Sequence, residues 1–158
     1  MARKPADQSV SPDDIILAAA DVLHQNGYEA TTMKDIAAQV NLTAASLYHH
    51  FKNKDTLLLA VLERGLKQAY QQIEAITKDT EKSVIQKLRE MVRWHVLTVT
   101  RNPTVSTAMV FEVRSLMSLK TASLDESQND DTDYDFLTRR DAFFDLRDKF
   151  EALFRYTV

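Results

Sequence analysis

Cysteine is absent from the 158-residue chain, which excludes disulfide bonds and thiolate metal sites. Glycine and proline are scarce, with two and three residues respectively. Because strand-rich folds need turn residues at short intervals, this scarcity favours long helices with few joints. The sequence also lacks an apolar run that could cross a bilayer and an apolar N-terminal stretch typical of a secretory signal. We therefore expect a soluble, cytoplasmic, all-α protein with no membrane partner.

An excess of positive charge is missing as well. The net charge is −3, and the first 60 residues hold five Lys and Arg against seven Asp and Glu. One segment differs, because residues 36–54 contain no Asp or Glu but carry His49, His50, Lys52 and Lys54. A nucleic-acid-binding surface, if the protein has one, must therefore be arranged locally around this segment.

Helix-start signals recur along the first third of the chain. Ser11 precedes Pro12 and Asp14, which predicts a capping box and a helix that ends at Gly27. Thr32 and Asp35 form a second capping box, and the helix that they open runs through residue 40.

A tight turn and a third short helix follow. Asn41 tolerates a positive φ, so it can form the turn, and Thr43 can cap a helix that reaches about His50. Two short helices joined by the three-residue turn 41–43 have the form of a helix-turn-helix.

The rest of the chain also predicts helices. Asn53 caps a long fourth helix, and a fifth begins at Asp79 or Thr80. A sixth helix starts at Pro103 and reaches about Leu116. The acidic stretch 124–135 predicts a mobile loop, and the last helix spans roughly residues 134–156.

The start of the third helix has the side chains that a recognition helix needs. Small or hydroxyl-bearing side chains allow the backbone to approach base edges in the major groove. Leu47 and Phe51 are four residues apart and should face the protein core, whereas Tyr48, His49 and His50 should face the groove wall. Core packing of Tyr48 is the alternative, but Leu47 and Phe51 already fill that face. The candidate base-reading residues are Thr43, Ala44, Ala45 and Ser46.

These motifs resemble the TetR family of bacterial repressors over about residues 11–62. The resemblance depends on four motifs at the family's mutual spacing: Gly27-Tyr28, Thr31-Thr32, Leu47-Tyr48-x-x-Phe51 and Lys54-x-x-Leu57-Leu58. Asn41 replaces a glycine that is usual in the family, and Ala44 replaces a common lysine. The resemblance implies a DNA-binding domain over residues 1–53 and a helical regulatory domain over residues 54–158.

The same resemblance implies roles for individual residues. Thr32, Tyr48 and Lys54 should contact phosphates of double-stranded DNA, with Lys34 and His50 as helpers. Such contacts position a protein without reading sequence. The residues that match the family's base-reading positions are Thr43, Ala44, Ala45 and Ser46. We expect a transcriptional repressor that binds a palindromic operator and leaves it when a small molecule binds.

The resemblance also places an effector site among the later helices. Glu112 and Arg114 are similar to a pattern in lipid- or acyl-thioester-responsive members, so we expect an apolar or acyl effector. Core packing is the alternative for most of the candidate residues, because Met and aromatic side chains at helical spacing usually form a core. The candidate pocket residues are Met91, Trp94, His95, Met109, Phe111, Phe144 and Phe150.

The sequence leaves alternatives for the oligomeric state and for the functional class. Members of the family end with two further helices that form a dimer interface, and the sequence ends at Val158 within the helix before them. A homodimer is therefore expected from the family but not assured by this chain. The alternative to a repressor is a shortened helical module that pairs with an intact regulator. We do not expect an enzyme, because the sequence has no phosphate loop and no nucleophile motif. His49 and His50 face different sides of a helix and cannot bind one metal ion together. No cofactor is expected.

Overall fold

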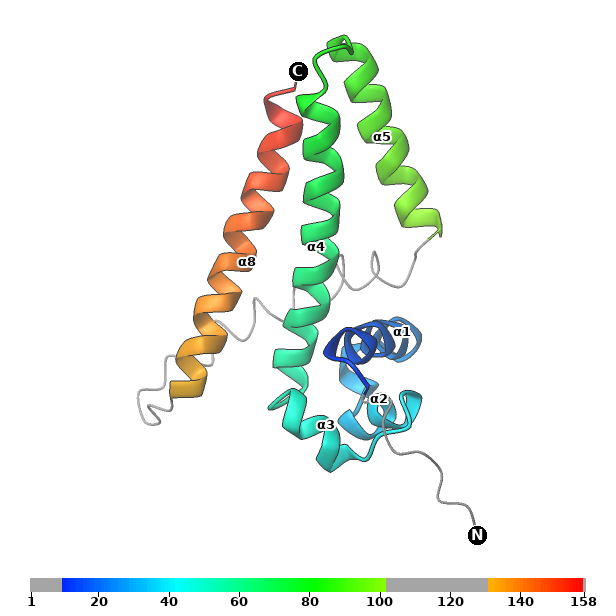
Figure 1. The fold of residues 1–158 in the computed structure, drawn as a ribbon, viewed down its shortest axis with the longest axis vertical. Coiled ribbons are helices and arrows are strands. Elements are labelled where there is room, and N and C mark those ends of the chain that lie inside the picture. Colours follow the sequence, from blue (N-terminus) through cyan, green and yellow to red (C-terminus); the bar gives the residue numbers. More distant parts are fainter. Residues whose placement is uncertain (1–9, 102–130, 158) are drawn as a thin grey trace.

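The computed structural model describes residues 10–101 and 131–157 (Figure 1). Its elements, in chain order, are α1 (Pro12–Ala30), α2 (Met33–Gln39), α3 (Ala44–His50), α4 (Lys54–Lys78), α5 (Val84–Arg101) and α8 (Asp131–Arg155). Every regular element in these two ranges is a helix, so the all-α prediction is confirmed. None of the helices described is long and apolar enough to span a bilayer.

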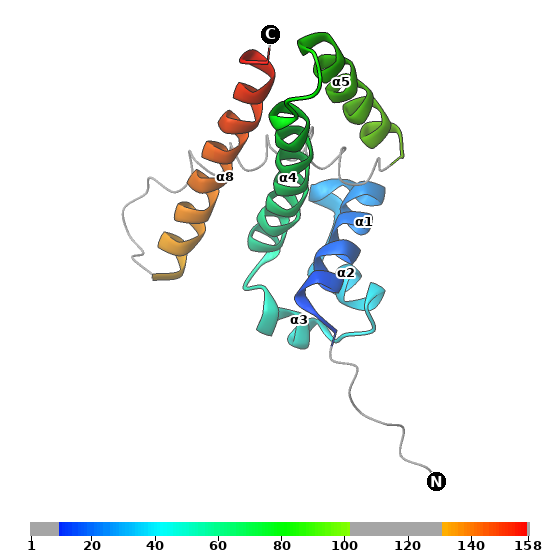
Figure 2. The ribbon, with the colours of Figure 1, turned by 45° about the horizontal axis from the view of Figure 1, so that its top comes forward.

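Helix α4 is the axis of the molecule. The three N-terminal helices pack around its first turns, and α5 and α8 flank its remaining length on opposite sides (Figures 1 and 2). Helix α8 runs in the same direction as α4, whereas α5 returns antiparallel to it (Figure 1). Helix α4 therefore connects the N-terminal helices to α5 and α8.

One hydrophobic core joins the N-terminal helices to α4 and reaches α8. Leu57, Leu58 and Leu62 of α4 are fully buried in it, and Phe143 of α8 is 2% exposed. Leu47 of α3 and Ile36 of α2 enter the same cluster. The head formed by α1, α2 and α3 is thus packed on α4 and not attached by a flexible linker.

The capping residues predicted from sequence are confirmed. Ser11 and Thr32 each accept a hydrogen bond from the backbone N–H three residues on, and each donates to the aspartate side chain there, which completes a reciprocal capping box. Thr43 accepts from the Ser46 N–H and Asn53 from the Thr56 N–H. These side chains satisfy N–H groups that the first turn of a helix leaves without a partner.

The turn between α2 and α3 follows from one asparagine. Asn41 has a φ of 55°, in the left-handed region that asparagine tolerates. Its N–H donates to the Ala38 carbonyl at 3.2 Å, and the Leu42 N–H donates to the Ala37 carbonyl at 2.8 Å. This pair of bonds is a Schellman motif, which ends α2 and directs the chain into α3.

Three boundaries differ from the prediction. Gly27 adopts a φ of 74° as expected, but the chain makes a further helical turn to Ala30. The fifth helix begins at Val84 and not at Asp79 or Thr80. The reason is that Ser83 caps it: the Ser83 N–H donates to Gln86 Oε1 at 2.8 Å, and the Gln86 N–H donates back to Ser83 Oγ.

The prediction of a loop over residues 124–135 is wrong for its last part, because residues 131–135 belong to α8. Aspartates at the start of a helix are stabilised by its dipole, so an acidic stretch is compatible with a helix N-terminus. The rest of that stretch and the predicted sixth helix over residues 103–116 lie outside the described residues.

Candidate nucleic-acid interface

Helix α3 lies at one end of the molecule, with one side against the core and one side open (Figure 2). Leu47 is fully buried and Phe51 is 8% exposed, so this pair fixes the rotation of the helix. Tyr48, one residue after Leu47, is 52% exposed. The predicted orientation is confirmed: the leucine and phenylalanine pack inward, and Tyr48, His49 and His50 point outward.

The first turn of α3 presents small and hydroxyl-bearing side chains. Ala45 is exposed and Ala44 is half-buried. The hydroxyl groups of Thr43 and Ser46 lie 3.0 Å apart and hydrogen-bond to each other. Thr43 Oγ1 also accepts from the Ser46 N–H at 3.1 Å. The predicted base-reading residues therefore form one compact surface at the N-terminal end of the helix.

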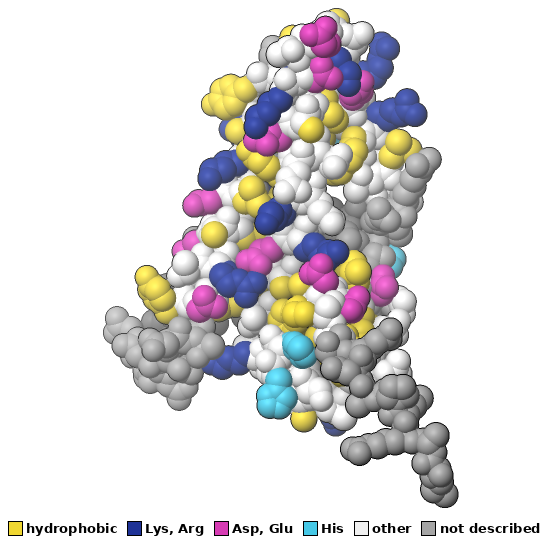
Figure 3. Space-filling view, viewed as in Figure 1, with side chains coloured by type: hydrophobic (Ala, Val, Ile, Leu, Met, Phe, Trp, Pro, Cys, Tyr) yellow, Lys and Arg dark blue, Asp and Glu magenta, His cyan; other side chains and the backbone are white. Residues whose placement is uncertain are grey.

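Positive and titratable side chains surround this surface. Lys34, His49, His50 and Lys52 are exposed, and no acid occurs between residues 36 and 54. Figure 3 shows histidine side chains at the tip of the head, whereas the acidic side chains visible on that face lie further along the molecule. On the face shown, the acidic side chains lie away from the histidines, and segment 36–54 adds no negative charge that would repel a phosphate backbone.

Thr32 is exposed at the start of α2, but both of its donors are in use. Its N–H donates to Asp35 Oδ2 at 2.9 Å, and its hydroxyl donates to the same oxygen at 2.6 Å. The hydroxyl and backbone hydrogen bonds from Thr32 lower the pKa of Asp35. A phosphate held by Thr32 would have to compete with this carboxylate.

Lys54 is engaged at the junction of α1 and α4. Its ammonium donates to the carbonyl oxygens of Tyr28 at 2.7 Å and Thr31 at 3.0 Å, and it lies 4.1 Å from the centroid of the Tyr28 ring. The Tyr28 hydroxyl in turn donates to Asp55. Burial raises the pKa of Asp55. We call Tyr28, Thr31, Lys54 and Asp55 the α1–α4 clasp.

The clasp joins residues far apart in sequence, and no motif predicted it. The family resemblance singled out Lys54 as a phosphate contact and implied no separate function for Tyr28 or Asp55. An ammonium group has three N–H donors, and the two carbonyls occupy two of them. The third N–H donor is left for a phosphate, so Lys54 could hold the end of α1 and contact DNA at the same time.

Two ion pairs connect α4 to its neighbours further along. Arg64 lies 2.9 Å from Asp13 of α1. Arg139 of α8 binds Glu63 with two bonds, from Nε to Oε1 at 3.3 Å and from Nη2 to Oε2 at 2.6 Å. The head, α4 and α8 are therefore linked by polar contacts as well as by the core.

The described candidates for ligand binding lie on two helices, α5 and α8, which flank α4 on opposite sides. Met91 is fully buried on α5, Trp94 is half-buried and His95 is exposed. Phe144 and Phe150 belong to α8 and pack against the main core cluster. Met109, Phe111, Glu112 and Arg114 lie outside the described residues.

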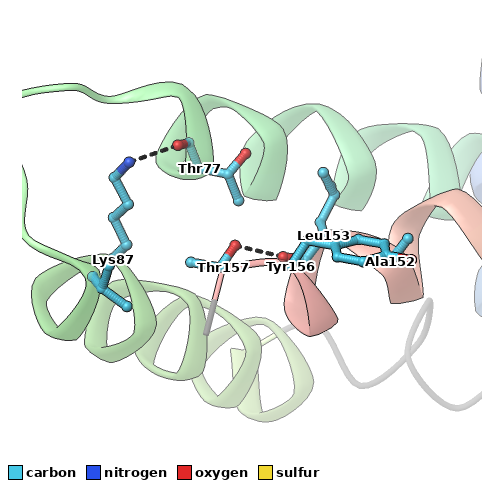
Figure 4. Close-up of a pocket in the computed structure, with 7 residues that line it drawn as sticks. Thr77, Lys87, Ala152, Leu153, Tyr156 and Thr157 are labelled. Atoms are coloured by element: carbon cyan, nitrogen blue, oxygen red, sulfur yellow. Dashed lines mark hydrogen bonds between the residues drawn. The ribbon is translucent and has the colours of Figure 1, made fainter.

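A hollow of about 370 Å³ lies elsewhere, between the last turns of α4 and α8 and the start of α5 (Figure 4). Lys87 crosses one side of it and donates to the Thr77 carbonyl at 2.8 Å. None of the predicted ligand residues lines this hollow. Its lining residues are Thr77, Val84, Lys87, Ala152, Leu153, Tyr156 and Thr157.

Comparison with known proteins identifies the head. Residues 15–61 match the family model described as bacterial regulatory proteins, tetR family. The HTH-type transcriptional repressor KstR2 of Mycolicibacterium smegmatis is 33% identical over 84 residues, which are 53% of this chain and 40% of KstR2. The chain thus matches less than half the length of this curated relative.

Solved structures share the fold. The TetR-family regulator PfmR of Thermus thermophilus superposes with a TM-score of 0.69 at 24% identity, covering 90% of this chain and 67% of PfmR. FadR of Bacillus subtilis, solved with stearoyl-CoA, superposes with a TM-score of 0.59 at 18% identity, covering 86% of this chain and 64% of FadR. At these identities the likeness establishes the arrangement of helices and nothing more.

Proposed function

Residues 15–61 belong to the TetR family of bacterial regulatory proteins, and on that premise we propose that this protein is a transcriptional repressor. It binds operator DNA through α3 and leaves the operator when a small molecule binds among the later helices. The DNA-binding domain ends at residue 53, and α4 begins the regulatory domain.

The observation that carries the proposal is the surface of α3. A helix enters the major groove only if its leading side chains are small enough for the backbone to approach the bases. Ala44, Ala45, Thr43 and Ser46 meet this condition at the start of α3. The alanine methyl groups can contact thymine methyls, and the two hydroxyls can donate to base edges once they release each other.

Phosphate contacts surround this surface. Tyr48 is 52% exposed, and Lys34 and His50 are exposed on either side of the turn. Lys54 contributes its third N–H donor, and Thr32 contributes a donor if the phosphate displaces Asp35. Because these groups contact the backbone and not the bases, they hold α3 in register for every sequence.

Release requires that ligand binding change the position of the head. Helix α4 joins the head to α5 and α8, and the α1–α4 clasp at its first turn fixes the head to it. A ligand that shifts α4 against α8 would therefore tilt α3, and in a homodimer it would change the distance between two recognition helices. FadR of Bacillus subtilis holds stearoyl-CoA in a similar fold, which supports an apolar or acyl effector.

A charge-matched pair of variants tests the DNA-binding surface. Ala45→Glu places an acid on the exposed side of α3, and Gln68→Glu adds the same charge at an exposed position on α4. We expect Ala45→Glu to abolish the footprint of the purified protein on its operator and Gln68→Glu to keep it. Equal losses would mean that net charge, and not α3, determines binding.

The same footprint separates the repressor from a shortened partner module. A repressor protects its operator as the purified homo-oligomer. A module that only pairs with an intact regulator would show no protection by itself and would form heterodimers with that regulator, and this result would reject the proposal.

A further inference from the structure

Helix α8 carries an arginine in the middle of its apolar face. Arg140 is only 6% exposed. Phe136, Phe143 and Phe144 lie four residues before it and three and four residues after it, and all three pack against the core cluster. Residues at these spacings share one face of a helix. A guanidinium group on such a face loses its hydration, which is costly unless an anion and enough acceptors replace the water.

The described residues do not supply those acceptors. Arg140 donates from Nε at 3.3 Å and from Nη2 at 3.0 Å, and both bonds go to one oxygen of Asp141. The Asp141 side chain is 70% exposed, so its own charge is largely solvated. Arg140 Nη1 is buried without a hydrogen-bond partner among the described residues. A guanidinium group has five N–H donors, so the two on Nη1 are unused.

The carboxylate on the facing part of α4 is already occupied. Glu63 accepts two hydrogen bonds from Arg139, the residue before Arg140. Each carboxylate oxygen of Glu63 thus accepts one bond from Arg139. Arg140 is a buried cation with an open donor group, and the Glu63 carboxylate is bound to its neighbour Arg139.

We propose that Arg140 binds the carboxylate of a small amphipathic ligand whose apolar body lies along the half-buried Phe136 and Phe144 of α8. A carboxylate can accept from Nη1 and from a second guanidinium nitrogen at once, which is the geometry that arginine favours for this group. The surrounding phenylalanines exclude a strongly hydrated ligand and favour an alkyl or aromatic body. The effector of the proposed function would then be an amphipathic carboxylate. Binding of this ligand does not depend on the proposed function, but its consequence, release of the operator, does.

Decanoate and 1-decanol are the probes, because they share an alkyl chain and differ in the charged head group. The full chain is titrated with each by calorimetry without DNA. We expect decanoate to bind the wild-type protein and 1-decanol to bind much more weakly. Arg140→Met should weaken decanoate binding by about 10-fold to 100-fold, the range for a lost charge-assisted hydrogen bond.

Arg147→Met is the matched control, since Arg147 is an exposed arginine on the same helix. It should bind decanoate as the wild-type protein does. The proposal is overturned if the wild-type protein does not bind decanoate, if 1-decanol binds equally well, or if Arg140→Met and Arg147→Met have the same affinity.

Thermal unfolding without ligand distinguishes a binding role from a structural one. Methionine replaces an incompletely paired buried cation by an apolar chain of similar length, so Arg140→Met should be at least as stable as the wild-type protein. A large drop in the melting temperature would show that Arg140 holds the fold, which would also overturn the proposal. Because none of these measurements uses DNA, they can fail while operator binding succeeds, and the reverse.

Discussion

At the scale of single residues, Tyr48 and Lys54 illustrate two ways of contacting a phosphate. Tyr48 is exposed and presents a neutral hydroxyl. Lys54 presents a charge, but its ammonium already holds the end of α1 through two carbonyl oxygens. Removing these side chains should therefore have different consequences for affinity, for salt dependence and for stability.

Tyr48→Phe should weaken binding to all DNA sequences alike by about 10-fold, the effect of one lost hydrogen bond to a charged group. The slope of log K against log salt should not change, because a neutral hydroxyl releases no counterion. The measurement is fluorescence anisotropy with operator and random duplexes over a range of salt concentrations. A loss confined to the operator would show that Tyr48 reads bases.

Lys54→Ala should reduce the magnitude of that slope by about 0.9, since one fewer phosphate is neutralised. It should also lower the free energy of unfolding by about 1 kcal/mol, because the clasp loses its hydrogen bonds to the end of α1. Denaturant titration measures the second effect. An unchanged stability together with the reduced slope would mean that the clasp does not contribute to the fold.

Asp35 gives a prediction for pH. Hydrogen bonds from Thr32 lower the pKa of Asp35 below its usual value, so the charged carboxylate stabilises the folded state. That contribution is present above the unfolded-state pKa and is lost as the pH falls through the lower folded-state value. We expect the melting temperature of the wild-type protein to fall on acidification from pH 5 to about pH 2, and Asp35→Asn to reduce that fall.

Thr32→Val provides the check on this cause. It removes the hydroxyl donor but keeps the backbone N–H that also donates to Asp35. Its acid dependence should therefore lie between those of the wild-type protein and Asp35→Asn. If Asp35→Asn has the same acid dependence as the wild-type protein, the capping carboxylate does not contribute to acid unfolding.

Contacts between residues far apart in sequence were the part that could not be predicted. The burial of Leu47 and Phe51 followed from their spacing, because spacing on one helix is a local property. The bond from Tyr28 to Asp55 joins residues 27 positions apart, and the bond from Arg139 to Glu63 joins residues 76 positions apart. No pattern in the sequence specifies such pairs before the helices are packed.

At the scale of elements, helix starts were predicted well where a side chain caps the first turn. Ser11, Thr32, Thr43 and Asn53 each bond to the N–H three residues on, as expected. The start of α5 was missed because several consecutive residues can cap a helix. Asp79 is instead the C-cap of α4, where its N–H donates to the Ile76 carbonyl, whereas Ser83 makes the reciprocal bonds with Gln86 at the start of α5.

Gly27 gives the prediction at this scale. Its φ of 74° and ψ of 167° lie in a region that only glycine adopts readily. A Cβ added there would meet no atom within 4 Å, so the cost of a substitution is conformational and not steric. Gly27→Ala should lower the free energy of unfolding by about 1–3 kcal/mol, as measured by urea titration.

Asn41→Gly is the companion variant, because Asn41 also has a positive φ, of 55°. Glycine adopts that conformation without strain, so this change should leave stability nearly unaltered or slightly higher. A Gly27→Ala protein as stable as the wild type would mean that the kink in α1 at Gly27 can adopt another conformation.

At the scale of the whole molecule, the core does not stop at the proposed domain boundary. The cluster that contains Leu47 of α3 continues through Leu58 and Leu62 of α4 to Phe143 of α8. The sequence indicated a head and a helical remainder, but it could not show that one core serves both. Because packing joins them, we expect the described helices to unfold together.

Phe143→Ala tests this continuity. Phe143 is 2% exposed, and its truncation should lower the free energy of unfolding by about 3–5 kcal/mol. Circular dichroism and hydrogen exchange at α3 should report the same shift, although α3 is distant in sequence. Tyr134→Ala, at a 76% exposed position of the same helix, should change stability by less than about 0.5 kcal/mol. Loss of protection confined to α8 would show that the head folds separately.

Whether α3 reads an operator is measured by selection of bound DNA from a random pool by the purified wild-type protein, together with the mass of the complex in solution. We expect enrichment of a palindromic site bound by two copies, with half-sites separated by about 34–36 Å or a multiple of that distance. If no sequence is enriched and the wild-type protein binds DNA no better than Ala45→Glu does, α3 does not read an operator.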